Sequence, residues 1–137
     1  MITWQQEWAH YKYWVMAHSQ QTYLAIRELA KDNSWSAEKD ATFHQLLQDA
    51  AKIPPTKATL TTAYQHVWGY FKKQCTPVER QTYLSLLSTL TPEQDQLGPF
   101  LKTLAIKYQV DYLLQSKIIQ DCQPPLLTTK KDSDSLK

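Results

Sequence analysis

The sequence predicts an all-α fold, a compact bundle of six or seven helices in a single domain. Three observations lead to this prediction. Apolar residues recur at intervals of three and four in the patterned segments, as they do on one face of a helix. Only Gly69 and Gly98 are glycines among 137 residues, whereas the turns of β-proteins use glycine often. The seven prolines fall between the periodic segments. We expect the helical domain to span residues 1–122 and the polar residues 123–137 to form a disordered C-terminal tail.

The first helix is expected to begin after Thr3, which forms a capping box with Gln6, and to run to about Ala17. Both of its sides carry apolar residues, so it should lie in the centre of the bundle. Ser19 is the predicted cap of a second helix, which ends near Lys31. The residues expected to be buried on this second helix are Tyr23, Leu24 and Leu29.

A third helix is predicted from Ser36 to the Pro54 and Pro55 pair, with Phe43, Leu47 and Ala50 on its inner face. The fourth helix has two stripes about 140° apart on the helical wheel. One stripe is apolar and should pack in the core: Leu60, Tyr64, Val67, Trp68 and Phe71. The other contains His66, Gly69, Tyr70 and Lys73.

Two proline-containing caps follow. Thr76, Pro77 and Glu79 predict the start of a fifth helix, and Thr91, Pro92 and Gln94 repeat the same pattern. A helix from about Pro99 to Gln109 and a last helix after Asp111 complete the predicted bundle. The apolar residues assigned to these helices are Tyr83, Leu86, Leu87, Leu90, Leu101, Leu104, Tyr108, Leu114 and Ile118.

Several classes of protein find no support in the sequence. Cys75 and Cys122 are too few for a disulfide framework or a CxxC zinc site, and the four histidines form no HxxxH or HExxH pair, so we expect no metal. Neither a GxSxG turn nor a glycine-rich phosphate loop occurs, which excludes the familiar hydrolase and nucleotide-cofactor signatures. No segment reaches the roughly 18 apolar residues of a membrane span, and a cytoplasmic protein is expected.

The segment between Lys52 and Arg80 has five basic residues and one acid, Glu79. Cations beside aromatic rings are typical of nucleic-acid surfaces, because cations meet phosphates while rings stack on bases. A solvated charged face is the simpler explanation. Gly69 within a helix costs up to about 1 kcal/mol relative to alanine, so we expect a neighbouring backbone or a ligand close to it. The candidate contact residues here are His66, Tyr70, Lys72, Lys73 and Arg80.

Two segments of the chain resemble motifs of the YbgA family, small bacterial domains of unknown function. These are KYWVMAHS, from Lys12 to Ser19, and HVWGYFKK with the following Glu79 and Arg80. In that family the domain occurs alone or fused to an iron–sulfur desulfidase domain that acts on thiouracil or on thiouridine in tRNA. The resemblance implies a tRNA-binding or substrate-presenting role. It adds Lys12, Tyr13 and His18 to the candidate surface.

The leading functional hypothesis is therefore a non-catalytic RNA-binding module without a cofactor. Its expected partners are RNA, in particular tRNA, and a desulfidase-type enzyme that it assists. One alternative is a small enzyme with a site around His18, His66 and Glu79. The other is a protein-interaction adaptor that uses the same aromatic face.

Overall fold

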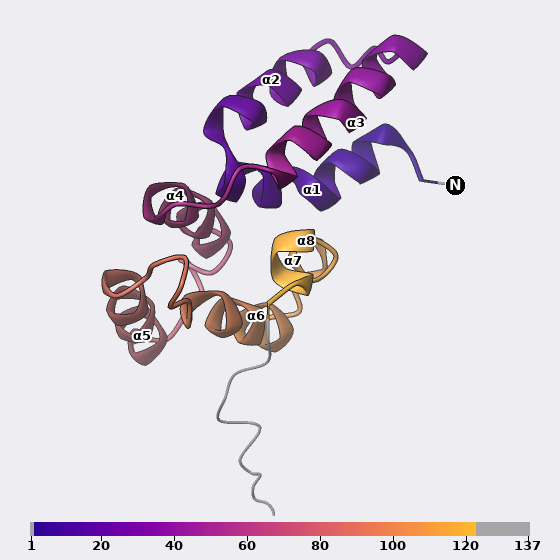
Figure 1. The fold of residues 1–137 in the computed structure, drawn as a ribbon. Helices are drawn as coiled ribbons and strands as arrows, with labels where there is room; N and C mark the ends of the chain where they lie inside the picture. Colours follow the sequence, from indigo (N-terminus) through magenta and orange to yellow (C-terminus); the bar gives the residue numbers. More distant parts are fainter. Residues whose placement is uncertain (1, 123–137) are drawn as a thin grey trace, which may run out of the picture.

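The computed structural model describes residues 2–122, and it contains eight helices and no sheet within that range (Figure 1). The helices are α1 (Trp4–His18), α2 (Gln20–Ala30), α3 (Ala37–Ala51), α4 (Lys57–Trp68), α5 (Pro77–Ser88), α6 (Leu97–Lys107), α7 (Asp111–Leu114) and α8 (Lys117–Gln120). The predicted all-α class is confirmed, with eight helices in the described residues where six or seven were expected. The predicted disordered tail, residues 123–137, lies outside the described residues.

Helix α1 is the centre of the bundle, as its apolar sequence predicts. Thr3 and Gln6 form the expected capping box, in which each side chain bonds the other residue's backbone N–H. The helix packs against α2, α3, α4 and α8. Its buried residues are Tyr13, Val15, Met16 and Ala17. A helix in contact with four others needs apolar residues on more than one face, which explains its weak amphipathicity.

Helices α2 and α3 pack against one another and against α1 (Figure 1). Ser19 ends α1 and caps α2 through a hydrogen bond from the backbone N–H of Thr22. The inner face of α2 consists of Thr22, Tyr23 and Ile26. The expected burial of Leu24 was wrong, because its side chain is 48 % exposed on the opposite face.

Helix α4 ends earlier than the two stripes of its sequence predicted. It stops at Trp68, and Gly69 is its C-cap with right-handed dihedral angles. The backbone then continues in tight turns, in which Tyr70 and Phe71 donate to carbonyls three residues earlier. A Cβ at Gly69 would approach only the carbonyl oxygens of His66 and Gln65, in its own turn. The expectation that another backbone comes close to Gly69 was therefore wrong.

The cap of α5 is formed as predicted, with Thr76 and Glu79 in a capping box around Pro77. Trp68 and Phe71 are buried, as expected, and the ring of Trp68 stacks on Tyr83 of α5 at 4.1 Å between centroids. The prediction of a second proline-containing helix cap was wrong. Thr91 and Gln94 pair in an isolated bridge that closes a turn, and the next helix begins only at Leu97.

The last predicted helix is divided in two. Ser116 is fully buried and its hydroxyl bonds the carbonyl of Leu113, which ends α7 before α8 begins. The division bends the chain so that α8 packs on both α1 and α6. Within residues 2–122, no helix combines the length and the apolar character that a membrane crossing requires.

Candidate nucleic-acid interface

Three tyrosines from distant parts of the chain meet beside α1, and we call them the tyrosine cluster. Tyr13 comes from α1, Tyr70 from the turn after α4, and Tyr112 from α7. The rings of Tyr70 and Tyr112 are stacked, 5.8 Å apart with 22° between their planes. Tyr13 meets both of them edge-on, at 6.3 Å and 6.4 Å. The turn that ends α4 thus aligns Tyr70 with residues from the two ends of the domain.

Tyr13 is the buried member of this cluster. It is only 6 % exposed, contrary to the expectation that its ring belongs to an open contact surface. Its hydroxyl lies 3.0 Å from that of Tyr70. Burial, and then the bond to Tyr70, raises the pKa of Tyr13 well above its usual value. Tyr13 therefore stays protonated and positions Tyr70, but it offers no face for stacking.

The exposed members of the cluster are Tyr70 and Tyr112, each 37 % exposed. Their mutual stacking covers one face of each ring and leaves surface available on the outer side. Burial, followed by the proximity of Tyr70, also raises the pKa of Tyr112. His66 is exposed beside them, with its ring centroid 6.3 Å from that of Tyr13. Sequence reasoning missed Tyr112, whose short helix gave no periodic signal.

Three exposed cations follow Tyr70, and we call them the basic turn: Lys72, Lys73 and Arg80. The guanidinium of Arg80 donates to the backbone carbonyl of Lys72 at 3.2 Å, which holds the start of α5 against the turn. Lys12 of α1 also lies beside the cluster, with its ammonium 5.7 Å from the centre of the Tyr13 ring. Lys12 and the basic turn thus both adjoin the tyrosine cluster.

The basic residues between Lys52 and Arg80 form two separate groups in the structure. Lys52 and Lys57 lie at the N-terminal end of α4, and the basic turn lies beyond its C-terminal end. Helix α4 has 12 residues, which corresponds to about 18 Å. Only the second group adjoins the tyrosine cluster.

Glu79, a candidate of the alternative enzyme hypothesis, is occupied by structural contacts. Its carboxylate caps α5 and accepts hydrogen bonds from Lys107 at 2.5 Å and from Tyr108 at 2.6 Å. Burial acts to raise its pKa, but the bonds from Lys107, Tyr108 and the Thr76 backbone lower it to about 2. The carboxylate is 13 % exposed and ties α5 to the end of α6.

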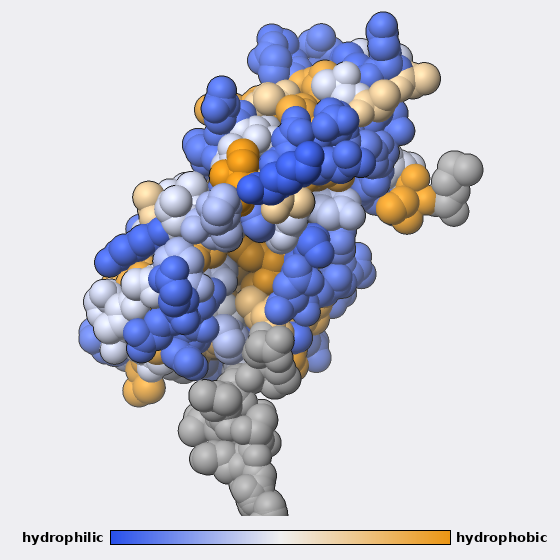
Figure 2. Space-filling model, viewed as in Figure 1, coloured by the Kyte–Doolittle hydropathy of each residue, from blue (hydrophilic) through white to orange (hydrophobic). Residues whose placement is uncertain are grey.

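His18 lies apart from the tyrosine cluster, at a pocket that we call the second pocket. Its Nδ1 is 2.7 Å from the carbonyl of Ile53, which accepts a hydrogen bond from it. The pocket has a volume of ≈ 350 Å³ and is formed by residues of α1, α4, α6 and α8. Figure 2 shows apolar surface between the α4–α5 side and the α7–α8 side of the molecule. No hydrogen bond or ring contact among residues 2–122 joins any two of His18, His66 and Glu79.

The second pocket contains two partly buried hydrogen bonds. The hydroxyl of Tyr64 donates to Asp95 at 2.5 Å, and the thiol of Cys122 bonds the carbonyl of Ile118 at 3.1 Å. Gly98 makes room for both groups, because a Cβ there would lie 2.7 Å from the Tyr64 oxygen and 2.8 Å from the Cys122 sulfur. Burial raises the pKa of the Cys122 thiol to about 12. The thiol is therefore protonated at neutral pH and is a poor nucleophile.

A further group that sequence reasoning missed joins α1 to α3. His44 Nε2 lies 2.8 Å from Glu7, and Asp40 lies one helical turn before His44. The three side chains offer ligand atoms within 4.8 Å of one another. Their hydrogen bonds are explained by an ion pair between a protonated His44 and the carboxylates. The bond to Glu7 raises the pKa of His44. The Asp40–His44 spacing of four was the signal that could have revealed it.

The fold and the site define a small all-helical domain with an exposed tyrosine pair near exposed cations. Residues 12–122 match the model of the family described as "Protein of unknown function (DUF1722)", and the chain belongs to that family. No curated protein and no solved structure matches the chain.

Proposed function

We propose that this protein is a non-catalytic RNA-binding module whose ligand is tRNA. The observation that carries the proposal is the exposed, stacked pair of Tyr70 and Tyr112 beside the basic turn. Aromatic rings bind unstacked bases, and exposed cations neutralise phosphates. Both the bases and the phosphates of an RNA strand could therefore bind there. The tyrosine cluster supplies a rigid platform, since Tyr13 holds Tyr70 through the hydroxyl pair.

The binding residues in this proposal are fewer than the sequence suggested. Lys72, Lys73, Arg80 and Lys12 contact phosphates, while Tyr70, Tyr112 and His66 contact bases. Tyr13 acts by positioning Tyr70. His18 lies at the second pocket and is not included.

The resemblance to the YbgA motifs supports a more specific role. Because that family includes fusions to a thiouridine desulfidase domain, the module would present tRNA to such an enzyme in the cytoplasm. The chain would then supply affinity and orientation while its partner supplies the chemistry.

Filter binding with bulk tRNA tests the proposal. Lys72→Ala, Lys73→Ala and Arg80→Ala should each weaken binding and lower the slope of log affinity against log salt by about 0.7 to 0.9, one phosphate contact each. Lys57→Ala is the matched control, because Lys57 is also exposed but lies at the far end of α4. A salt-insensitive interaction with a protein would instead support the adaptor hypothesis.

A further inference from the structure

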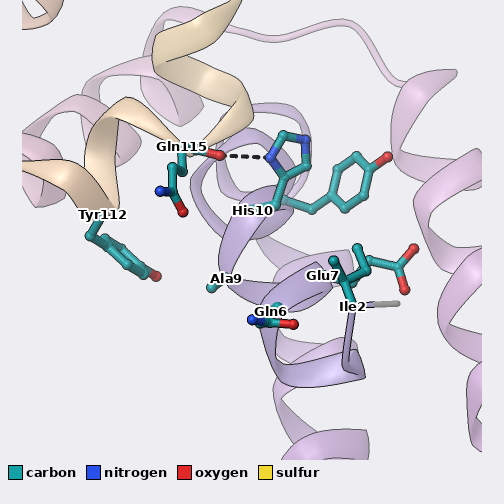
Figure 3. A pocket seen from close by; sticks show the side chains of 8 residues that line it. Ile2, Gln6, Glu7, Ala9, His10, Tyr112 and Gln115 are labelled. Carbon is teal, nitrogen blue, oxygen red and sulfur yellow. Dashed lines mark hydrogen bonds between the residues drawn. The ribbon is translucent and has the colours of Figure 1, made fainter.

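A pocket lined by Tyr112 adjoins the tyrosine cluster. It has a volume of ≈ 560 Å³, within the usual range of small-molecule sites, and lies between α1 and the α7 region (Figure 3). Tyr112 lines this pocket and also stacks on Tyr70. The pocket and the proposed RNA surface are therefore continuous through one ring.

The pocket offers free hydrogen-bonding groups. Within residues 2–122 the side-chain amide of Gln115 has no hydrogen-bond partner. The Gln6 oxygen accepts from the Thr3 backbone N–H, which leaves the Gln6 –NH₂ group available. An amide has both donors and an acceptor, the groups that match the edge of a nucleobase. Figure 3 shows Tyr112 and Gln115 on the opposite side of the pocket from Gln6 and Ile2.

One wall of the pocket is held in place by a link between α1 and the chain after α7. The carbonyl of Gln115 accepts a hydrogen bond from His10 Nδ1 at 2.8 Å. Since a carbonyl can only accept, Nδ1 carries the proton, and the link fixes both the histidine ring and the backbone of Gln115. The pocket thus has a rigid polar wall on one side and the Tyr112 ring on another.

The charge of the pocket favours a neutral ligand over a phosphate. Its one carboxylate, Glu7, is paired with His44, and the exposed cations of the basic turn do not line the pocket. A phosphate would gain little there, whereas a base has an apolar face and a polar edge that the lining can satisfy.

We infer that this pocket binds a single nucleobase, unstacked from the strand whose phosphates contact the basic turn. The base lies against Tyr112, and the amides of Gln6 and Gln115 contact its polar edge. This inference rests on the proposed function for the identity of the ligand as RNA. It adds a base-binding pocket to a surface that would otherwise contact only phosphates and bases stacked on the tyrosine rings.

Uncharged nucleosides test the pocket apart from the phosphate contacts. Titration of ¹⁵N-labelled protein with uridine, cytidine and adenosine should produce saturable shifts of the Ala9, His10 and Gln115 amides, and ribose should not. Ala9→Phe, which fills the pocket, and Gln115→Ala, at an exposed position, should each weaken the nucleoside shifts and tRNA binding by roughly tenfold. Gln115→Ala tests the inference if Ala9→Phe does not fold.

The outcomes separate the two proposals. If wild-type protein binds tRNA but no nucleoside shifts the pocket amides, or if Gln115→Ala leaves both measurements unchanged, the pocket inference is overturned and the RNA proposal stands. If nucleosides shift the pocket amides but tRNA binding does not depend on salt, the pocket stands and the proposed function fails.

Discussion

The hydroxyl groups of Tyr13 and Tyr70 lie 3.0 Å apart and join the two segments that resemble the YbgA motifs. Tyr13 is buried in α1, and Tyr70 is exposed in the turn after α4. The pair explains why two distant segments can form one surface. The buried tyrosine fixes the exposed one, and the exposed ring is the part that a ligand can reach.

Substitution of Tyr70 should affect binding more than folding. Tyr70→Ala removes a stacking platform, and we expect tRNA affinity to fall by about 1 to 3 kcal/mol per stacked base. The neighbouring Phe71→Ala is the contrasting variant. Phe71 is fully buried, so its loss should destabilise the fold by about 3 to 5 kcal/mol. Urea denaturation and filter binding of both variants measure the contrast, and equal loss of stability in both would contradict it.

The two glycines should respond differently to alanine. At Gly98 a Cβ would meet the Tyr64 oxygen at 2.7 Å, and Tyr64 cannot move freely because Asp95 holds its hydroxyl. Gly98→Ala should therefore lower the free energy of unfolding by about 1 to 3 kcal/mol. Gly69 has right-handed dihedral angles and contacts only its own turn, so Gly69→Ala should change stability by less than about 1 kcal/mol. Denaturant unfolding tests this order, and a larger effect at Gly69 would refute it.

Glu79 should stabilise the fold in a pH-dependent way. Its pKa of about 2 lies below that of an unfolded glutamate, so its contribution is present at neutral pH and is lost as pH falls from about 4.5 toward 2. Glu79→Gln should cost about 1 to 3 kcal/mol at pH 7, because it removes a charged acceptor from Lys107 and Tyr108.

Thermal unfolding of wild type and Glu79→Gln at several pH values measures this effect. The two curves should converge in strong acid, where wild-type Glu79 is also neutral. A destabilisation that is independent of pH would mean that the charge of Glu79 does not matter.

His44 should have the opposite pH dependence. Its pKa is raised by the hydrogen bond to Glu7, so the stability it provides is complete below about pH 6.5 and is lost as pH rises through the folded-state pKa. The pair is partly exposed, and we expect at most about 1 kcal/mol. NMR titration should give a higher pKa for His44 in wild type than in Glu7→Gln. Equal values would show that Glu7 does not influence His44.

The sequence was sufficient for the features that depend on neighbours along the chain. The capping boxes at Thr3 and Thr76 and the buried face of α3 follow from local spacing, and the structure has them as predicted. Local spacing also misled in places. The stripe through Tyr70 assumed a continuous helix, but the backbone leaves helical hydrogen bonding after Trp68.

Features that depend on contacts between distant segments could not be predicted in this way. Tyr112 and Tyr70 belong to distant segments, α7 and the turn after α4, and their rings meet only in the folded domain. The burial of Tyr13 depends on α4 covering that side of α1. Sequence spacing on α1 placed Tyr13 on the correct helix but could not say which neighbours cover it.

The role of the basic turn in RNA binding is the central claim, and filter binding of bulk tRNA at about 50 and 200 mM salt tests it most directly. The decisive variant combines Lys72→Ala, Lys73→Ala and Arg80→Ala. Its charge-matched control combines Lys31→Ala, Lys52→Ala and Lys57→Ala, which are exposed and lie outside the tyrosine cluster and the basic turn. We expect the first variant to lose affinity and most of the salt dependence, and the control to bind nearly as wild type does. Wild-type protein that binds tRNA no more tightly than the first variant would contradict the claim.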